Sequence, residues 1–130
     1  MQSFPDWLIA ELRSDHAGET GAVMIYRGIL VFCRDATLRD FATRHMATEQ
    51  GHLRLIEEVL PPHQHSRLLP IWRVAGWITG ALPALFGPRA VYATIDAVES
   101  FVDHHYQQQI DRLDAEGIFP ELRAMLARCQ

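Results

Sequence analysis

The chain has 130 residues, a formal net charge of −4 and two cysteines. This length suits one domain with a single hydrophobic core and is short for two, and the acidic balance argues against nucleic acid as a partner. Cys33 and Cys129 lie far apart and in no zinc-type spacing, which predicts reduced thiols in a reducing compartment. The first ten residues lack the basic and apolar regions of a secretory signal.

Hydrophobic residues recur at helical spacing over most of the chain. The pattern predicts four helices, from Leu8 to about Cys33, from Leu38 to Leu60, from about Arg89 to Leu113 or Ala115, and from Glu121 to Gln130. Pro61 ends the second helix because proline cannot continue one. Gly18, Gly21 and Gly28 each weaken the first helix by about 1 kcal/mol relative to alanine, so we expect a neighbouring helix to approach it closely. The sequence therefore indicates an all-α protein.

A carboxylate lies on the apolar face of the first predicted helix. Steps of four and three residues place Glu19 in line with Leu12, His16, Val23, Tyr26 and Leu30. A charged group on a buried face is costly unless it is paired, protonated or bound to a cation. Glu19 therefore requires a partner.

The second and third long helices repeat this feature. Glu49 and His52 form a Glu-x-x-His pair on the apolar face of one helix, and Glu99 lies in line with Ile95 and Tyr106 on the other. Ferritin-like dinuclear sites use two single-Glu helices and two Glu-x-x-His helices, and three of those four contributions are visible. Carboxylates with imidazole favour iron or manganese over structural zinc. A register shifted by one position would instead direct these carboxylates into solvent.

Other polar side chains have simpler interpretations. His16 and His45 are typical of hydrogen-bonded core histidines or of partners that orient a metal ligand. Asp15 either orients a ligand histidine or is solvated in the early turns of its helix, and Tyr106 packs in the bundle by default. The charged residues of the second helix predict a solvated face: Arg39, Arg44, Arg54, Glu57 and Glu58.

The segment from Leu68 to Gly87 is apolar and contains Trp72 and Trp77, with Arg73 as its only charge. A transmembrane helix needs about 20 predominantly apolar residues, whereas prolines 70 and 83 interrupt this segment. Two interpretations stay open: a core helix that covers the bundle, or a helix that lies in a membrane interface.

Taken together, these stretches resemble the demethoxyubiquinone hydroxylases of ubiquinone biosynthesis, also called 3-demethoxyubiquinol 3-hydroxylases. The matching stretches are DHAGETGA at 15–22, EQGHL at 49–53, LPIW at 69–72, AVE at 97–99 and HHYQ at 104–107. They occur in the family's order, and the resemblance extends from about Arg13 to Gln130.

The resemblance implies one ferritin-like domain over residues 1–130 that acts as a di-iron monooxygenase. Such an enzyme inserts one oxygen atom from dioxygen into the ring of a demethoxyubiquinone, with two iron ions in the complete site and electrons from NADH. Carried over by position, the metal ligands are Glu19, Glu49, His52 and Glu99, with no catalytic residue beyond them. His105 and Tyr106 match residues near the quinone in the family.

The resemblance also implies where the protein acts. The apolar segment matches the family's membrane-contacting region, which favours the interface helix and a peripheral protein on the cytoplasmic face of a bacterial inner membrane. The expected partners are a ubiquinone precursor, the membrane surface, other ubiquinone-biosynthesis proteins and further copies of the chain.

One stretch departs from the family. Its last helix carries a second Glu-x-x-His, and residues 121–130 resemble only the first half of that helix, so we expect a truncated last helix and a site completed by a longer chain or a partner. A non-catalytic quinone-binding, lipid-binding or assembly module would keep the fold with an incomplete metal site. An iron-storage or peroxide-reducing ferritin relative would use the same ligands but leave the apolar segment unexplained.

Overall fold

A computed structural model describes residues 3–130, and nearly all of them are helical. The elements are α1 (Asp6–Phe32), α2 (Ala36–Val59), a short 3-10 helix η1 (Pro62–Gln64), α3 (Leu69–Ala84), α4 (Pro88–Glu116) and α5 (Pro120–Cys129). No strand occurs among these described residues. The all-α prediction is confirmed, and the five α-helices are consistent with a ferritin-like helical bundle.

The chain forms two compact units, and the boundary between them falls within α4, after Tyr92. The first contains α1, α2, η1 and α3, and the second contains most of α4 together with α5. Each unit is described by itself. A single domain over residues 1–130 therefore stays a prediction.

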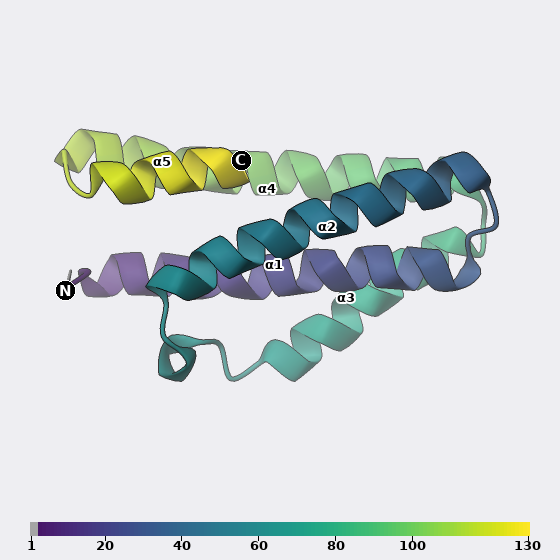
Figure 1. Cartoon of the computed structure of the whole chain (residues 1–130), viewed down its shortest axis with the longest axis horizontal. Coiled ribbons are helices and arrows are strands. Elements are labelled where there is room, and N and C mark those ends of the chain that lie inside the picture. Colours follow the sequence, from purple (N-terminus) through teal and green to yellow (C-terminus); the bar gives the residue numbers. More distant parts are fainter. Residues whose placement is uncertain (1–2) are drawn as a thin grey trace. The chain divides into compact units, whose positions relative to one another are not determined.

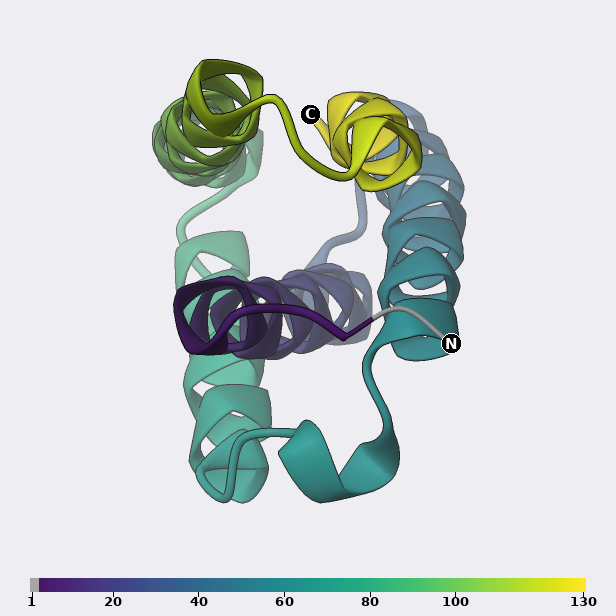
Figure 2. The same ribbon diagram turned by 90° about the vertical axis from the view of Figure 1, so that its left-hand side faces the viewer.

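In the first unit, α1 packs against both α2 and α3 (Figures 1 and 2). Leu8, Leu12 and Ile29 of α1 are almost completely buried, as are Leu38 and Ile56 of α2. Burying a side chain of this size contributes about 1.5–3 kcal/mol. Val23 and Tyr26 of the predicted face of α1 are buried as well, so the apolar faces are confirmed except at the end of α1, where Ile29 is buried in place of the predicted Leu30.

The joint between α1 and α2 is fixed by two polar side chains. The Asp35 carboxylate accepts a hydrogen bond from the Leu38 backbone N–H at 2.8 Å and so caps α2. Arg39 donates from Nη1 to the carbonyl oxygens of Leu30 at 2.7 Å and Cys33 at 2.8 Å. The positive charge of Arg39 also interacts favourably with the partial negative charge at the C-terminal end of α1. Exposed Arg39 therefore does more than cover a solvated face.

Glycines allow the backbones of α1 and α3 to touch. A Cβ atom on Gly80 would collide with the carbonyl oxygen of Ile25, and one on Gly76 with that of Gly21. A Cβ atom on Gly28 would likewise collide with the Trp77 carbonyl oxygen. The close approach predicted for the α1 glycines is thus confirmed at Gly21 and Gly28.

The side of α3 that faces away from α1 is apolar and exposed. Ile71, Val74, Ile78 and Leu82 are each about half exposed or more, and they recur at helical spacing. Phe86, just after the helix, is 77% exposed. Among the residues described, no helix combines the length and the apolar character that crossing a bilayer requires.

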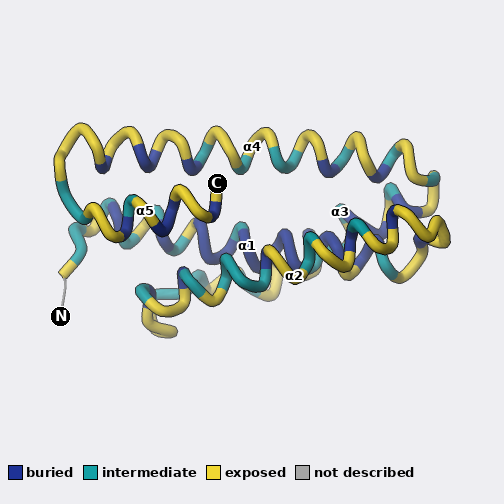
Figure 3. Tube along the Cα trace, turned by 45° about the horizontal axis from the view of Figure 1, so that its top comes forward, coloured by how far each residue is buried: buried dark blue, intermediate teal, exposed yellow. Residues whose placement is uncertain are grey.

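The second unit is a helical hairpin. Buried and half-buried residues follow one edge of α4 and exposed residues follow the other (Figure 3). Gly117 has a φ of +62° and ends α4, and Pro120 starts α5. Arg123 pairs with Asp114 at 3.1 Å. Further along α5, Gln130 donates a hydrogen bond to the side chain of Gln107 at 2.8 Å, so α5 runs antiparallel to α4.

Candidate metal centre

The middle of α1 brings polar side chains into the protein interior. Asp15, His16, Glu19 and Thr20 are all buried, with Glu19 only 3% exposed. The burial of Glu19 is what its helical register predicts, and the alternative register in which it faces solvent is wrong. Asp15 is also 3% exposed, so the interpretation of a solvated aspartate is wrong as well.

Glu49 and His52 of α2 face Glu19. The three residues come from two helices, and their potential ligand atoms lie within 4.8 Å of one another. Nδ1 of His52 is 3.4 Å from a Glu49 oxygen and 3.8 Å from a Glu19 oxygen. The Glu-x-x-His spacing causes this arrangement, because residues three apart lie on the same face of a helix. Two carboxylates and one imidazole thus converge in the first unit.

The surroundings of Glu49 favour its charged form. Burial acts to raise the pKa of this carboxyl, but hydrogen bonds with His52 and Glu19 and the nearby His52 and His45 side chains outweigh burial and lower the pKa. Nδ1 of His52 is buried and lies between the carboxylates of Glu49 and Glu19. A buried imidazole nitrogen beside carboxylate oxygens is a donor set that suits a divalent iron or manganese ion.

Aromatic rings pack beside this group. His45 stacks on Phe41 with ring centroids 3.9 Å apart, and the Tyr26 ring lies 6.0 Å from His45. His45 does not belong to the group of potential ligands formed by Glu19, Glu49 and His52. This agrees with the interpretation of His45 as a neighbour of the ligands.

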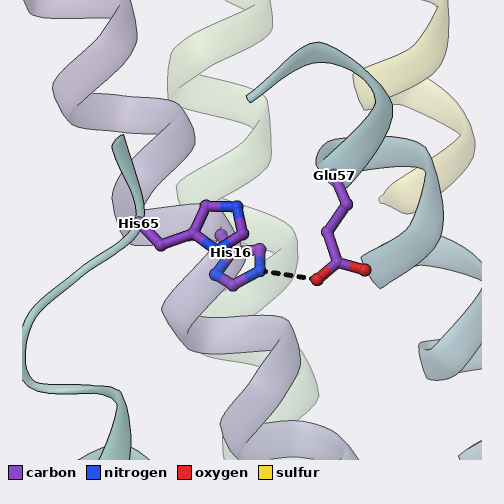
Figure 4. A group of neighbouring side chains, drawn as sticks. All are labelled: His16, Glu57 and His65. Carbon is purple, nitrogen blue, oxygen red and sulfur yellow. Dashed lines mark hydrogen bonds and ion pairs between the residues drawn. The ribbon is translucent and has the colours of Figure 1, made fainter. Parts of the chain in front are cut away.

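A second cluster lies in the first unit, and sequence reasoning did not find it. His16 of α1, Glu57 of α2 and His65, in the segment between η1 and α3, have potential ligand atoms within 4.8 Å of one another (Figure 4). Burial lowers the pKa of His16, although its hydrogen bond with Glu57 acts in the opposite direction. Glu57 is exposed, as predicted, but it is paired with a buried histidine.

The remaining predicted site residues belong to the second unit. Glu99 is half-buried, and Tyr106 is only 2% exposed. Nε2 of His105 lies 2.9 Å from Nε2 of Gln109, one turn further along α4. Ring contacts connect His105 with Phe101 and Tyr106. Metal binding by Glu99 and quinone binding by His105 and Tyr106 stay predictions from the sequence.

The chain is similar to known proteins over most of its length. Residues 6–130 match the family described as Ubiquinone biosynthesis protein COQ7. The chain is 40% identical over 105 residues to the 3-demethoxyubiquinol 3-hydroxylase of Rhodospirillum rubrum, which covers 78% of this chain and 50% of that protein.

Two eukaryotic relatives carry the name NADPH-dependent 3-demethoxyubiquinone 3-hydroxylase, mitochondrial. The Rattus norvegicus protein is 35% identical over 107 residues, 81% of this chain and 49% of that protein. The Dictyostelium discoideum protein is 36% identical over 113 residues, 82% of this chain and 50% of that protein. The chain thus spans about half the length of the curated relatives it matches. With nearly its whole length matched, the chain belongs to the COQ7 family of ubiquinone biosynthesis proteins.

Proposed function

We propose that this chain carries the iron-binding part of a monooxygenase that hydroxylates the ring of a demethoxyubiquinone intermediate. The observation that supports this most is the convergence of Glu19, Glu49 and His52 in a buried position. Membership of the COQ7 family gives the substrate class, and relatives in that family are named as hydroxylases. The reaction adds one oxygen atom of dioxygen to the ring and reduces the other to water.

The residues present fit such a metal centre. Glu19 and Glu49 supply carboxylate oxygens and His52 supplies an imidazole nitrogen, while the lowered pKa of Glu49 keeps its carboxylate ionised at neutral pH. When bound, iron supplies the redox chemistry with dioxygen. The protein positions the ligands on two helices and limits their contact with bulk water. Glu99 is the fourth proposed ligand in this chain, and its support comes from the sequence.

Electrons have to reach the site from a reduced nicotinamide. The resemblance implies NADH, whereas the rat and Dictyostelium relatives are named as NADPH-dependent. The sequence contains no glycine-rich turn after a strand that would bind the nucleotide itself. We therefore propose external delivery of electrons, and comparing product formation with NADH and with NADPH identifies the preferred donor.

We further propose that the exposed side of α3 docks on a membrane surface. Its side chains are apolar, Trp72 is 43% exposed, and Arg73 is the only charge in the helix. Trp and Arg suit the interface between lipid and water, and a ubiquinone precursor is itself a lipid. The cytoplasmic face of a bacterial inner membrane is the proposed location. Other ubiquinone-biosynthesis proteins and further copies of the chain are proposed partners.

Iron binding tests the metal centre directly. Anaerobic titration with Fe²⁺ should show binding to the wild-type chain and at least a tenfold weaker affinity in Glu49→Gln, because the amide lacks the negative charge of the carboxylate. Glu58→Gln removes an exposed carboxylate from the same helix and is the matched control. Equal iron binding by wild type and Glu49→Gln would refute the assignment.

Turnover tests the reaction. In a protein extended through a second Glu-x-x-His and supplied with iron, dioxygen labelled with ¹⁸O, a reduced nicotinamide and a demethoxyubiquinol analogue, mass spectrometry should detect one labelled oxygen atom in the product ring. Glu49→Gln should abolish this incorporation, and Glu58→Gln should keep it. A chain that binds the analogue and iron but incorporates no oxygen would instead support the non-catalytic quinone-binding module.

A further inference from the structure

We propose that His16, Glu57 and His65 form a second metal site, one that binds Zn²⁺ and is separate from the proposed iron ligands. The three side chains come from α1, from α2 and from the segment that leads into α3. None of them belongs to the group of Glu19, Glu49 and His52. Two imidazoles and one carboxylate form a donor set that zinc accepts when water occupies a fourth position, and imidazole ligands also favour zinc over magnesium or calcium.

The distances require only a local adjustment. Nε2 of His16 lies 3.1 Å from Oε2 of Glu57. Tetrahedral zinc with bonds of about 2.0–2.1 Å holds its donor atoms roughly 3.3 Å apart, so this pair already has the required separation. His65 has a potential ligand atom within 4.8 Å of the other two and lies outside the α-helices, so its side chain can shift without breaking a hydrogen bond of α1, α2 or α3.

The hydrogen bonding of His65 selects its ligand atom. Nε2 of His65 lies 3.0 Å from the Leu60 carbonyl oxygen. A carbonyl oxygen only accepts, so Nε2 carries the proton and Nδ1 keeps the lone pair. Histidines that bind metals characteristically donate their other N–H to a carbonyl or carboxylate in this way. Nδ1 is therefore the nitrogen of His65 that can bind zinc while the hydrogen bond to Leu60 is kept.

The exposure of the cluster allows an ion to enter. His16 is 3% exposed, whereas the Glu57 side chain is 45% exposed. Glu57 also lines a surface pocket with Phe4, Leu60, Pro61 and Gln64, which leaves room for the water ligand. The His16 imidazole is buried on a helix and is held in place. The Glu57 carboxylate lies at a pocket, where an ion and a water molecule can reach it.

Two features limit the affinity. The His16 and His65 rings lie against each other in Figure 4. Their centroids are 3.8 Å apart and their planes are 26° apart, so the rings are stacked. A metal ion lies in the plane of each imidazole that binds it, so His65 has to turn out of the stack. The positive charge of Arg73 also acts on His16. We expect zinc to bind with a loss of the ring stacking, and the proton that His16 shares with Glu57 has to move from Nε2 to Nδ1 of the same ring.

Calorimetric titration with Zn²⁺ tests this site in the full chain. In a Glu49→Gln background, which weakens the proposed iron ligands, about one zinc ion per chain should still bind. Adding His65→Gln should weaken that binding at least tenfold. His63→Gln is the matched control, because His63 in η1 is exposed, lies two residues before His65 and is outside the cluster. We choose His65 over His16 because substitution of a buried histidine would disturb folding.

Two outcomes would overturn the proposal. One is equal zinc affinity with and without His65→Gln, and the other is loss of all zinc binding in Glu49→Gln alone. A thermal unfolding series supplies a second measurement: zinc should raise the melting temperature of wild type and His63→Gln, because it connects three segments in the folded state only. Zinc should raise the melting temperature of His65→Gln much less. Neither overturning outcome would affect the proposed iron centre.

Discussion

At the scale of single residues, the sequence reveals two of the carboxylates that are buried within helices. Glu19 and Glu49 interrupt an apolar pattern of known period, so their burial follows from their positions. His65 lies in an irregular segment and meets His16 across 49 positions of sequence. No helical period relates a residue in an irregular segment to one in a distant helix, so the sequence does not reveal the second cluster.

Glu99 is the residue whose role most needs a direct measurement. Substitution Glu99→Gln should lower the iron affinity of the chain several-fold if its carboxylate binds iron, since one negative ligand is lost. Anaerobic Fe²⁺ titration measures the effect, and Asp103→Asn on the exposed side of α4 is the control. An unchanged affinity in Glu99→Gln would show that the resemblance was carried over wrongly at this position.

At the scale of helices, the sequence predicted the existence of the elements well and their contacts less well. Four predicted helices agree with α1, α2, α4 and α5 to within three residues, and α3 lies within the apolar segment from Leu68 to Gly87 that both interpretations took as a helix. The prolines at 61 and 120 fix two of these ends. The glycines of α1 indicated close packing, but only the coordinates show that α3 is the partner and that Gly18 takes no part.

The contact between α1 and α3 predicts opposite effects for two similar substitutions. Gly80→Ala should destabilise the protein by about 2 kcal/mol or more, because its new methyl group would meet the Ile25 backbone. Gly18→Ala should stabilise it by about 0.5–1 kcal/mol, because a Cβ atom there meets nothing within 4 Å and alanine favours the helix. Urea unfolding compares them, and equal stabilities would contradict the described packing.

At the scale of the whole molecule, α3 predicts attachment to lipid. Substitution Ile78→Glu places a charge on its exposed apolar side and should reduce binding to vesicles about tenfold, because burying an isoleucine contributes about 1.5–3 kcal/mol. Ala47→Glu makes the same charge change at an exposed position of α2. Sedimentation with liposomes measures both variants, and equal retention would remove α3 from the docking surface.

The glycines of α3 also restrict how this helix can rotate. With its backbone against that of α1 at Gly76 and Gly80, α3 cannot roll about its long axis without driving a larger side chain into its neighbour. The direction in which Ile71, Ile78 and Leu82 project is therefore governed by residues that have no side chain at all. A change at Gly76 would alter the angle at which the proposed docking side of α3 faces a lipid surface, even though Gly76 itself is buried against α1.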